Sequence, residues 1–323
     1  MRNSSEGHIS GFDDKKRIIR VGSRASRLAV IQSELVMDRI EEACPGIQTE
    51  LVTMKTTGDR ILDKTLDQIG GKGLFVRELD EALRSGAVDI TVHSLKDLPK
   101  DIPEGLPLAA FSVREDPRDV LILPKGSASI DNSLPVGTSS LRRSLQFRAL
   151  FPDTETAPVR GNVETRLSKL DEGQYSGLIM AAAGLIRLGL EDRISRYFSP
   201  EEMIPASCQG ILGIQTRSDN TELAGMLADS VNSRASEFSA ASERAFIKTV
   251  GADCGSPDTA YSWLEGGKLH IRGFRVDPLS GRMDTEELCG SISSTEDAEL
   301  LGRELAEVLL HKNRRRTLVT SVV

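Results

Sequence analysis

Arginines recur in this sequence at positions where strands are expected to end. Arg24 follows one apolar stretch, Arg160 follows a second, and Arg187 follows a third. In open α/β sheets, ligands bind beyond the carboxyl ends of the strands. Arginine at such positions can bind a carboxylate or a phosphate through bidentate hydrogen bonds. The set therefore predicts an anion-binding site, although pairing with surface Asp or Glu remains the alternative for any single arginine.

One strand-to-helix turn adds to this prediction. Residues 136–140 are typical of a strand that runs into a helix, and Arg142 and Arg143 lie in the first turn of that helix. Hydroxyls and backbone N–H groups at a helix start attract anions. Arg166 lies six residues beyond Arg160, in the next expected helix, and so belongs to the same set.

Lys96 and Asp97 form a second candidate site, because they follow the expected strand at residues 88–92. An aspartate at the carboxyl end of a strand can stabilise a cationic intermediate or carry a proton. The alternative is a plain ion pair between Lys96 and Asp97 in an ordinary turn before Pro99.

The four cysteines are scattered along the chain: Cys44, Cys208, Cys254 and Cys289. None has the C-x-x-C spacing of a zinc site, so the sequence predicts neither a metal site nor a disulfide framework. Cys254 lies in a loop with glycine and proline, where a thiol is more accessible than in a helix core. Two interpretations of Cys254 remain: it is either a nucleophile or a plain thiol in a loop.

Regular elements must position these residues, and alternating strands and helices predict an α/β fold with a largely parallel sheet. In the first part of the chain, strands are expected at 17–22, 47–54 and 88–92, with helices at about 28–40 and 75–84. Ser23 or Ser26 is expected to cap the first helix. The apolar positions that share one face of that helix are Leu28, Ile31, Leu35, Val36 and Ile40.

The pattern restarts after Pro117, which predicts a second α/β domain. Strands are expected there at 120–123, 136–137 and 177–180, with helices at 140–150 and 163–170. A further strand is expected at 211–215. The remainder is typical of a small α+β domain, with helices at 235–250 and 298–310 and strands at 259–264 and 268–276.

Three domains follow from this pattern. They comprise residues 17–113 with 212–231, residues 118–206, and residues 234–323, after a disordered tail at 1–16. Residues 58–73 are charged and end in several glycines, which is typical of a lid-like loop.

The overall charge and hydropathy exclude several classes of protein. The chain has 323 residues and a formal net charge of −7, which argues against a general nucleic-acid binder. No apolar run approaches the ~20 residues that cross a bilayer, so no membrane segment is expected. Residues 1–20 lack the apolar region of a secretory signal, so a cytoplasmic location is expected. The basic run at 311–316 is typical of a solvated helix end.

Several motifs, taken together, resemble those of porphobilinogen deaminases. They are 21–29 (VGSRASRLA), 70–75 (GGKGLF), 92–99 (VHSLKDLP), 137–143 (GTSSLRR), 160–167 (RGNVETRL) and 183–189 (AGLIRLG). Their order and spacing match from about residue 18 to the end of the chain. The chain is therefore identified as a member of this family, by resemblance.

The resemblance implies a fold of three domains, with two α/β domains like those of type II periplasmic binding proteins and a small α+β C-terminal domain. It implies a dipyrromethane cofactor, made from two porphobilinogen units and linked through a thioether to Cys254. Four further porphobilinogens add head to tail, each losing ammonia, and water then releases hydroxymethylbilane for haem, chlorophyll or corrin biosynthesis. The enzyme would be a transferase, hydroxymethylbilane synthase, that acts as a cytoplasmic monomer on a small molecule.

Roles for individual residues also follow from the resemblance. Asp97 matches the catalytic aspartate, which stabilises the cationic azafulvene left after ammonia departs. The positions that match cofactor-binding residues, besides Cys254, are Lys96, Asp97, Thr138, Ser139, Ser140, Arg142, Arg143, Arg160 and Gly161. The positions that match substrate carboxylate-binding residues are Arg24, Ser26, Arg160, Arg166 and Arg187. A mobile loop near the cleft is marked by Gly58, Lys72 and Phe75.

Two positions depart from the family pattern. Arg27 stands where proline is usual, and Asp253 precedes Cys254 where glycine is usual. Two rival hypotheses are an anion-binding module of the periplasmic type and an inactive relative of the enzyme. The binding module predicts a signal peptide and gives Asp97 and Cys254 no role.

Overall fold

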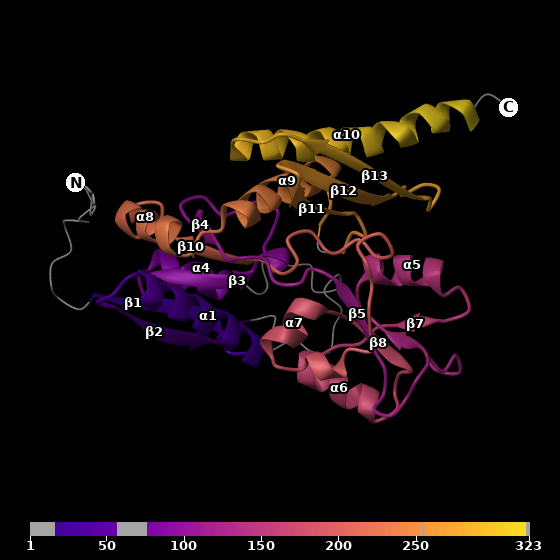
Figure 1. Ribbon diagram of the computed structural model, residues 1–323, viewed down its shortest axis with the longest axis horizontal. Helices are drawn as coiled ribbons and strands as arrows, with labels where there is room; N and C mark the ends of the chain where they lie inside the picture. The colour runs from indigo at the N-terminus through magenta and orange to yellow at the C-terminus, as the bar shows by residue number, and fades with distance from the viewer. Residues whose placement is uncertain (1–16, 57–75, 254, 321–323) are drawn as a thin grey trace, which may run out of the picture.

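The computed structural model describes residues 17–56, 76–253 and 255–320, and within this part the side chains from Ile18 to Lys312. Three sheets define three lobes (Figure 1), and the third lobe lies above the other two in this view. The first lobe is built on a five-stranded sheet of order β2-β1-β3-β10-β4. Its strands are β1 (Arg17–Arg24), β2 (Ile47–Met54), β3 (Ile90–Ser94), β4 (Leu108–Phe111) and β10 (Leu212–Thr216).

The second lobe repeats the arrangement of the first. Its five-stranded sheet has the order β7-β6-β8-β5-β9. The strands are β5 (Asp119–Ile122), β6 (Val136–Gly137), β7 (Thr156–Ala157), β8 (Gly177–Ala181) and β9 (Arg196–Tyr197). In the first sheet β2 is outermost and β10 lies between β3 and β4, whereas in the second β7 is outermost and β5 lies between β8 and β9. The chain crosses between these lobes twice: the first crossing (112–118) leads into β5, and the second crossing (198–211) leads into β10. Two matching α/β lobes agree with the fold class that the sequence predicts.

The sheets are mixed, so the expectation of a largely parallel sheet is wrong. β1 is parallel to β2 and β3, whereas β10 is antiparallel to β3 and β4. In the second lobe, β6 is parallel to β7 and β8, whereas β5 is antiparallel to β8 and β9. The physical reason is that β10 and β5 enter each sheet from the other lobe and run against their neighbours.

The helices of the first lobe are α1 (Arg27–Ala43), α4 (Arg77–Arg84) and α8 (Thr221–Ser230). Ser26 caps α1, since its side chain accepts from Ala29 N, whereas Ser23 lies within β1. The buried residues of α1 are Gln32, Ser33, Val36 and Ile40. Leu35 is 49% exposed, so its predicted place on the buried face is wrong. It lies next to Val36 and therefore about 100° around the helix from the row that faces the sheet.

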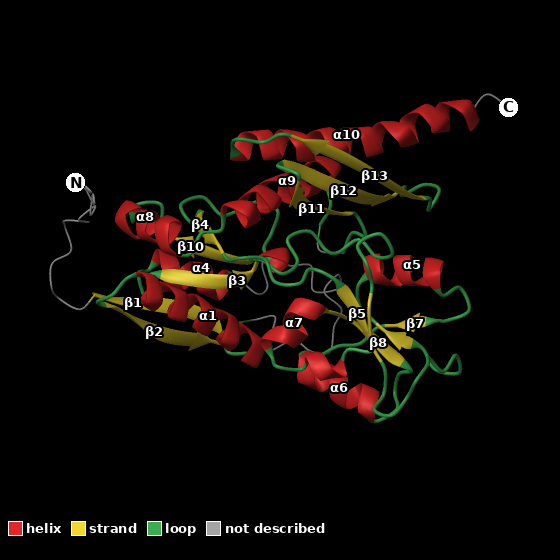
Figure 2. Ribbon diagram, in the orientation of Figure 1, coloured by secondary structure: helices red, strands yellow, loops and turns green. Residues whose placement is uncertain are grey.

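The helices of the second lobe are α5 (Leu141–Leu150), α6 (Val163–Asp171) and α7 (Ala182–Arg187), followed by the short 3₁₀ turn η2 (Glu191–Arg193). Another 3₁₀ turn, η1 (Leu95–Asp97), lies in the first lobe. Side chains of Ser140 and Asn162 cap α5 and α6. Helices α1 and α7 approach each other where the two lobes meet (Figure 2). A Cβ added at Gly184 would lie 3.6 Å from Leu28 Cδ2, so the two helices are in van der Waals contact.

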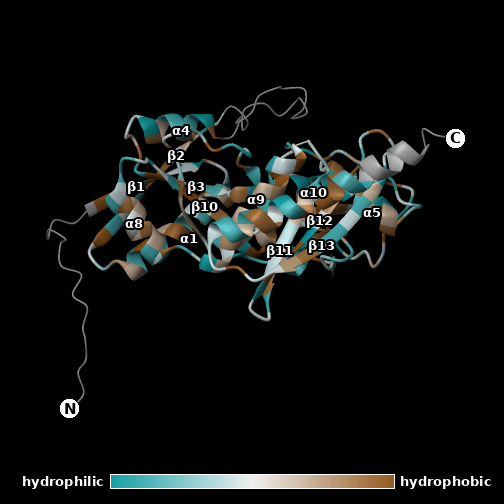
Figure 3. Ribbon diagram, turned by 90° about the horizontal axis from the view of Figure 1, so that it is seen from above, coloured by the Kyte–Doolittle hydropathy of each residue, from teal (hydrophilic) through white to brown (hydrophobic). Residues whose placement is uncertain are grey.

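The third lobe packs two helices against a small sheet of order β11-β12-β13. Its elements are α9 (Arg234–Val250), β11 (Thr259–Glu265), β12 (Lys268–Val276), β13 (Met283–Gly290) and α10 (Thr295–Thr320). Hydrophobic and hydrophilic residues alternate along α10 (Figure 3), and Leu301, Leu305 and Leu309 are buried in the core of this lobe. The sequence did not predict β13, because its acidic residues have low strand propensity.

Some predicted features lie outside the described residues. They are the tail at 1–16, the loop residues Gly58, Lys72 and Phe75, and Cys254. Among the residues that are described, no helix is long and apolar enough to cross a membrane.

Candidate active site

Asp97 and Lys96 lie where β3 ends, as the sequence predicts. Strand β3 is almost wholly buried, and the η1 turn that follows is anchored by buried Leu95 and Leu98. The Asp97 side chain is exposed, whereas Lys96 is half-buried and donates from Nζ to Gln209 Oε1 at 3.1 Å. The turn therefore presents one accessible carboxylate beside one partly buried ammonium group.

Burial lowers the pKa of Lys96 to about 8. The carboxylates of Asp97 and Asp119 raise it, whereas the guanidinium groups of Arg143 and Arg142 lower it further. Because burial disfavours the charged form of Lys96, a carboxylate bound beside it would stabilise that charged form.

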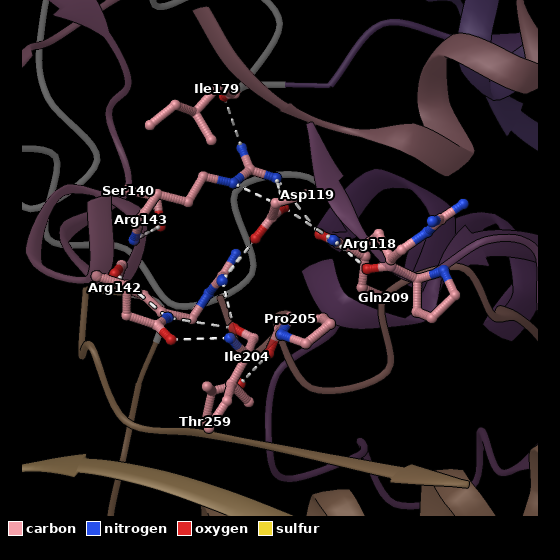
Figure 4. A network of polar contacts seen from close by, with 12 residues as sticks. Arg118, Asp119, Ser140, Arg142, Arg143, Ile179, Ile204, Pro205, Gln209 and Thr259 are labelled. Atoms are coloured by element: carbon pink, nitrogen blue, oxygen red, sulfur yellow. Dashed lines mark hydrogen bonds and ion pairs between the residues drawn. The ribbon is translucent and has the colours of Figure 1, made fainter. Parts of the chain in front are cut away.

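Arg142 and Arg143 occupy the first turn of α5 and converge on Asp119, the first residue of β5 (Figure 4). Arg142 Nη1 lies 2.7 Å from Asp119 Oδ2, and Arg143 Nη2 lies 2.7 Å from Oδ1. Arg142 also donates to Ile204 O, and Arg143 to Ile179 O.

Asp119 is fully buried, and burial alone would raise its pKa. The two guanidinium groups outweigh burial and hold the pKa of Asp119 well below its usual range. Two cations against one carboxylate leave this trio with one net positive charge. Asp119 thus orients the arginine pair without cancelling its attraction for an anion.

Arg166 links the second lobe to Asp97 electrostatically. Burial lowers the pKa of Arg166 to about 10, the charges of Arg143 and Arg160 lower it further, and Asp97 raises it. Arg143, Arg160 and Asp97, from two lobes, therefore all act on the charge of Arg166. The structure thus brings Arg143 and Arg160, which the sequence predicts on separate elements, near Arg166.

Gly161 sets the position of Arg166. Its φ of +116° is a region that favours glycine, and an added Cβ would lie 2.6 Å from Thr165 Cγ2. Arg166 Nε donates to the Gly161 carbonyl at 2.8 Å. A side chain at residue 161 would therefore disturb the turn that holds this guanidinium group.

Thr138 and Ser139 organise the turn between β6 and α5. Ser139 Oγ donates to Val159 O at 2.7 Å and lies 3.1 Å from Val159 N, which donates to it. Thr138 Oγ1 accepts from Ser140 N at 3.3 Å. The Ser139 hydroxyl therefore holds this turn against the residue that precedes Arg160, and the Thr138 hydroxyl braces the turn itself.

Arg24, at the end of β1, borders a cavity of about 30 Å³ that also reaches Asp97. A cavity of this size holds a water molecule. Its lining includes Gln32, His93 and Ser94, and Ser94 Oγ donates to Gln32 Oε1 at 3.0 Å. Ser26 lies two residues beyond Arg24, at the cap of α1.

His93 is buried beside this cavity, with Nε2 2.9 Å from Thr91 Oγ1. Burial lowers the pKa of His93 to about 4, and the charge of Arg24 acts in the same direction. His93 is therefore neutral at pH 7 and adds no charge to the site.

Arg187 is the last residue of α7 and contacts the second crossing between lobes. Its Nη2 donates to Gly210 O at 2.6 Å. Burial lowers the pKa of Arg187 to about 10, and Glu115 raises it.

The residues around Cys254 are tied to the Asp97 turn. Arg244, in α9, donates to Pro99 O at 2.7 Å, and Lys100 Nζ donates to Gly251 O at 3.4 Å. Gly251 ends α9 in the left-handed conformation, with a φ of 76°. The chain that leads to Cys254 is therefore held against the segment that follows Asp97.

Arg27, the unusual residue of the first motif, has a partner in the other lobe. Its Nη1 lies 3.4 Å from Glu164 Oε1 in an exposed ion pair. Exposed pairs of this kind contribute ~0–1 kcal/mol.

Reasoning from the sequence missed Asp119, Gln209 and Gln32, and it gave no role to His93 and Ser94, although both lie in the motif at 92–99. An aspartate opening an otherwise apolar strand was a usable signal for Asp119, because a buried acid needs a cationic partner. Nothing local marked Gln209, whose contacts come from residues far away in the sequence.

The chain matches one family model across most of both α/β lobes. This model, described as "Porphobilinogen deaminase, dipyromethane cofactor binding domain", matches residues 19–225. The chain belongs to the porphobilinogen deaminase family. The porphobilinogen deaminase of Acetivibrio thermocellus is 55% identical over 259 residues, which cover 80% of this chain and 88% of that protein. The one from Alkaliphilus metalliredigens is 42% identical over 94% of this chain and 96% of its own length.

Solved structures give weaker likenesses. The VFT2 domain of Bordetella pertussis BvgS has a TM-score of 0.40 and 15% identity, over 69% of this chain and 90% of that chain. The L-cystine solute receptor of Neisseria gonorrhoeae has a TM-score of 0.36 and 12% identity, over 67% of this chain and 86% of that chain.

The activity of the family is therefore the activity of this chain: it is a transferase that makes hydroxymethylbilane from porphobilinogen, and dipyrromethane is its cofactor. The described residues fit such a group. Arg143 and Arg160 act against the positive charge of Arg166, and burial disfavours the charged form of Lys96. A ligand with several carboxylates relieves that repulsion, as a chain of pyrroles with acetate and propionate groups would.

Proposed function

We propose that porphobilinogen units are condensed head to tail at Asp97, between the cations of the first and second lobes. The observation that supports this most is the single accessible carboxylate of Asp97 among Lys96 and Arg166. Anions bind to the surrounding cations, whereas the accessible carboxylate of Asp97 stabilises a developing cation. The site thus offers opposite charges for two different parts of one substrate.

The carboxylates of substrate and cofactor are the anions that these cations hold. Lys96, the Arg142–Arg143 pair, Arg160 and the turn at residues 138–140, with Gly161, are the proposed cofactor-binding residues. Arg24, Ser26, Arg160, Arg166 and Arg187 are the proposed substrate-binding residues. Charge-assisted pairs of guanidinium with carboxylate are short and directional, so they fix the ring as well as hold it.

Asp97 acts on the reacting part of porphobilinogen. From the protonated aminomethyl group, ammonia leaves with the electron pair of the carbon–nitrogen bond, and the remaining pyrrole carries the positive charge. A fixed carboxylate beside that charge lowers the barrier, because it needs no rearrangement as the charge develops. The same carboxylate can accept a hydrogen bond from the pyrrole N–H.

Cys254 is proposed as the attachment point of the cofactor. When bound there, dipyrromethane supplies the primer to which porphobilinogen adds. The contacts of Arg244 and Lys100 support this role, since they hold the chain that leads to Cys254 beside the Asp97 turn.

We further propose that the three domains are residues 17–113 with 212–231, residues 118–206 and residues 234–323. The separate sheets of the three lobes support these boundaries. A cytoplasmic monomer without a nucleic-acid partner is proposed as well. The net charge of −7 supports the last point, and the free thiols of Cys44, Cys208 and Cys289 suit a reducing compartment.

Two measurements on the purified chain test the roles of Cys254 and Asp97. Intact-mass spectrometry is expected to show the sequence mass plus one dipyrromethane, and the bare mass for Cys254→Ser. Asp97→Ala is expected to keep the circular dichroism spectrum of the parent but to lose at least ~10²-fold in kcat. Near-normal turnover of Asp97→Ala, or an unmodified parent from a host that makes pyrroles, would count against the proposal.

A further inference from the structure

Gln209 lies at the boundary between the first two lobes and is fully buried. Its Oε1 accepts from Lys96 Nζ at 3.1 Å and from Arg143 Nη2 at 3.4 Å. Its Nε2 donates to Pro117 O at 2.7 Å and to Asp119 Oδ1 at 2.9 Å. One amide therefore contacts a cation of the first lobe, a cation of the second, and the carboxylate that orients the arginine pair.

These contacts fix which way the amide points. In the opposite orientation, the N–H groups of Gln209 would face Lys96 and Arg143, and its oxygen would face Pro117 O and Asp119. Both sides of the amide would then be mispaired, which is costly in a buried site. Gln209 thus places a neutral acceptor between two cations.

The backbone that carries Gln209 is held by the third lobe. Cys208 has a φ of 63°, in the left-handed region that non-glycine residues rarely adopt. The Cys208 N–H donates to Glu243, and Arg114 Nε donates to Gln209 O at 2.8 Å. A strained backbone conformation persists where several surrounding contacts hold it in place, and such residues often lie beside a functional site.

We propose that Gln209 is a positioning residue. It holds Lys96 and Arg143, which come from different lobes, at one carboxylate-binding site, and it leaves their positive charges available to the ligand. This inference rests on the proposed function, in which both cations bind carboxylates. Gln209 touches neither substrate nor reacting atoms in this role and acts only through its two neighbours.

Neutrality is the essential property of the side chain at position 209. The charged groups that face Lys96 are Asp97, Asp119, Arg142 and Arg143. Together with Lys96 they carry three positive and two negative charges, which leaves one net positive charge for a ligand. A glutamate at 209 would cancel that charge and keep a similar size and an acceptor for the two cations, but it would lose the N–H donor to Pro117 O and Asp119.

The test uses the full-length protein with its cofactor and three variants. Gln209→Glu adds a charge, and Gln209→Met removes both hydrogen-bonding groups at similar size. Gln215→Met is the matched control, because Gln215 is a buried amide that donates to Leu106 O within the first lobe. Reductive ¹³C-methylation labels the lysines for NMR titration, and a Lys96→Arg sample identifies the Lys96 signal.

Gln209→Glu is expected to raise the titration midpoint of Lys96 by about one unit. Gln209→Met is expected to lower it, because the charged form loses an acceptor, whereas Gln215→Met leaves it in place. In steady-state kinetics, both Gln209 variants are expected to raise KM for porphobilinogen about tenfold with kcat close to that of the parent.

An unchanged Lys96 midpoint in both Gln209 variants would overturn the positioning role, whatever their activity. An equal shift in Gln215→Met would do the same, because it would trace the effect to general loosening of the lobe. If Gln209→Met does not fold, the upward shift in Gln209→Glu still decides the question. Loss of activity in Lys96→Arg tests the proposed function separately, since that variant leaves Gln209 intact.

Discussion

Arg114 and Glu243 form a buried ion pair, with Nη1 2.7 Å from Oε1, that joins the first crossing between lobes to helix α9. The Glu243 carboxylate also accepts from Cys208 N, in the second crossing, and from Ser262 N in β11. Both crossings therefore meet the third lobe at one carboxylate.

Replacing Glu243 by Gln is expected to destabilise the whole chain. The guanidinium of Arg114 would remain buried without its counter-charge, which costs ~3 kcal/mol or more in free energy of unfolding. Urea unfolding followed by circular dichroism measures the change. Glu299→Gln, which breaks the exposed pair between Arg303 and Glu299, is the control and is expected to cost less than ~1 kcal/mol. Equal losses in the two variants would contradict a special role for the buried pair.

Because Cys208 has a left-handed backbone conformation, we expect its glycine variant to be at least as stable as its alanine variant, which reverses the usual order of stability. In ordinary helix or strand backbone, glycine is less stable than alanine by ~0.5–1 kcal/mol. At a φ of 63°, the strain that alanine suffers is absent in glycine. Cys208→Gly is therefore expected to unfold at the same or a higher urea concentration than Cys208→Ala. A clearly more stable Cys208→Ala would show that the strain is relieved elsewhere.

Acid is expected to destabilise the protein through His93. Its folded pKa of about 4 lies below the ordinary value of 6.5, so below pH 6.5 the unfolded chain binds a proton that the folded chain does not. The stability from neutral His93 is present above pH 6.5 and is lost as the pH falls towards 4, by ~3 kcal/mol. His93→Gln is expected to flatten this part of the pH profile of the unfolding free energy. Parallel profiles for parent and variant would assign the acid sensitivity to other groups.

The sequence predicted the positions of the charged residues better than their partners. Arg142 and Arg143 open a helix after a short strand, as expected, because the strand-to-helix turn is encoded locally. Their common partner Asp119 lies more than twenty residues earlier, and only the second-lobe sheet brings it under them. Pairing across a sheet depends on register, which local spacing does not encode.

Three features were missed or mispredicted because each depends on its partners in the fold. Strand β13 was missed because its acidic residues hide the alternation that its pairing with β12 reveals. The expectation of a largely parallel sheet failed because β10 and β5 arrive from the opposite lobe. Gln209 escaped notice because an isolated glutamine has no chemical signature until a lysine and an arginine from separate lobes converge on it.

The mixed first sheet also dictates an order of assembly on the ribosome. Strand β10 pairs with β3 and β4, yet it is synthesised only after every strand of the second lobe. The second lobe is continuous in sequence from β5 to β9 and has its complete sheet before β10 emerges. Contacts between residues close in sequence form earlier and faster than distant ones. We therefore expect the second lobe to fold first during translation, with the edge of β3 left open until β10 arrives to close it.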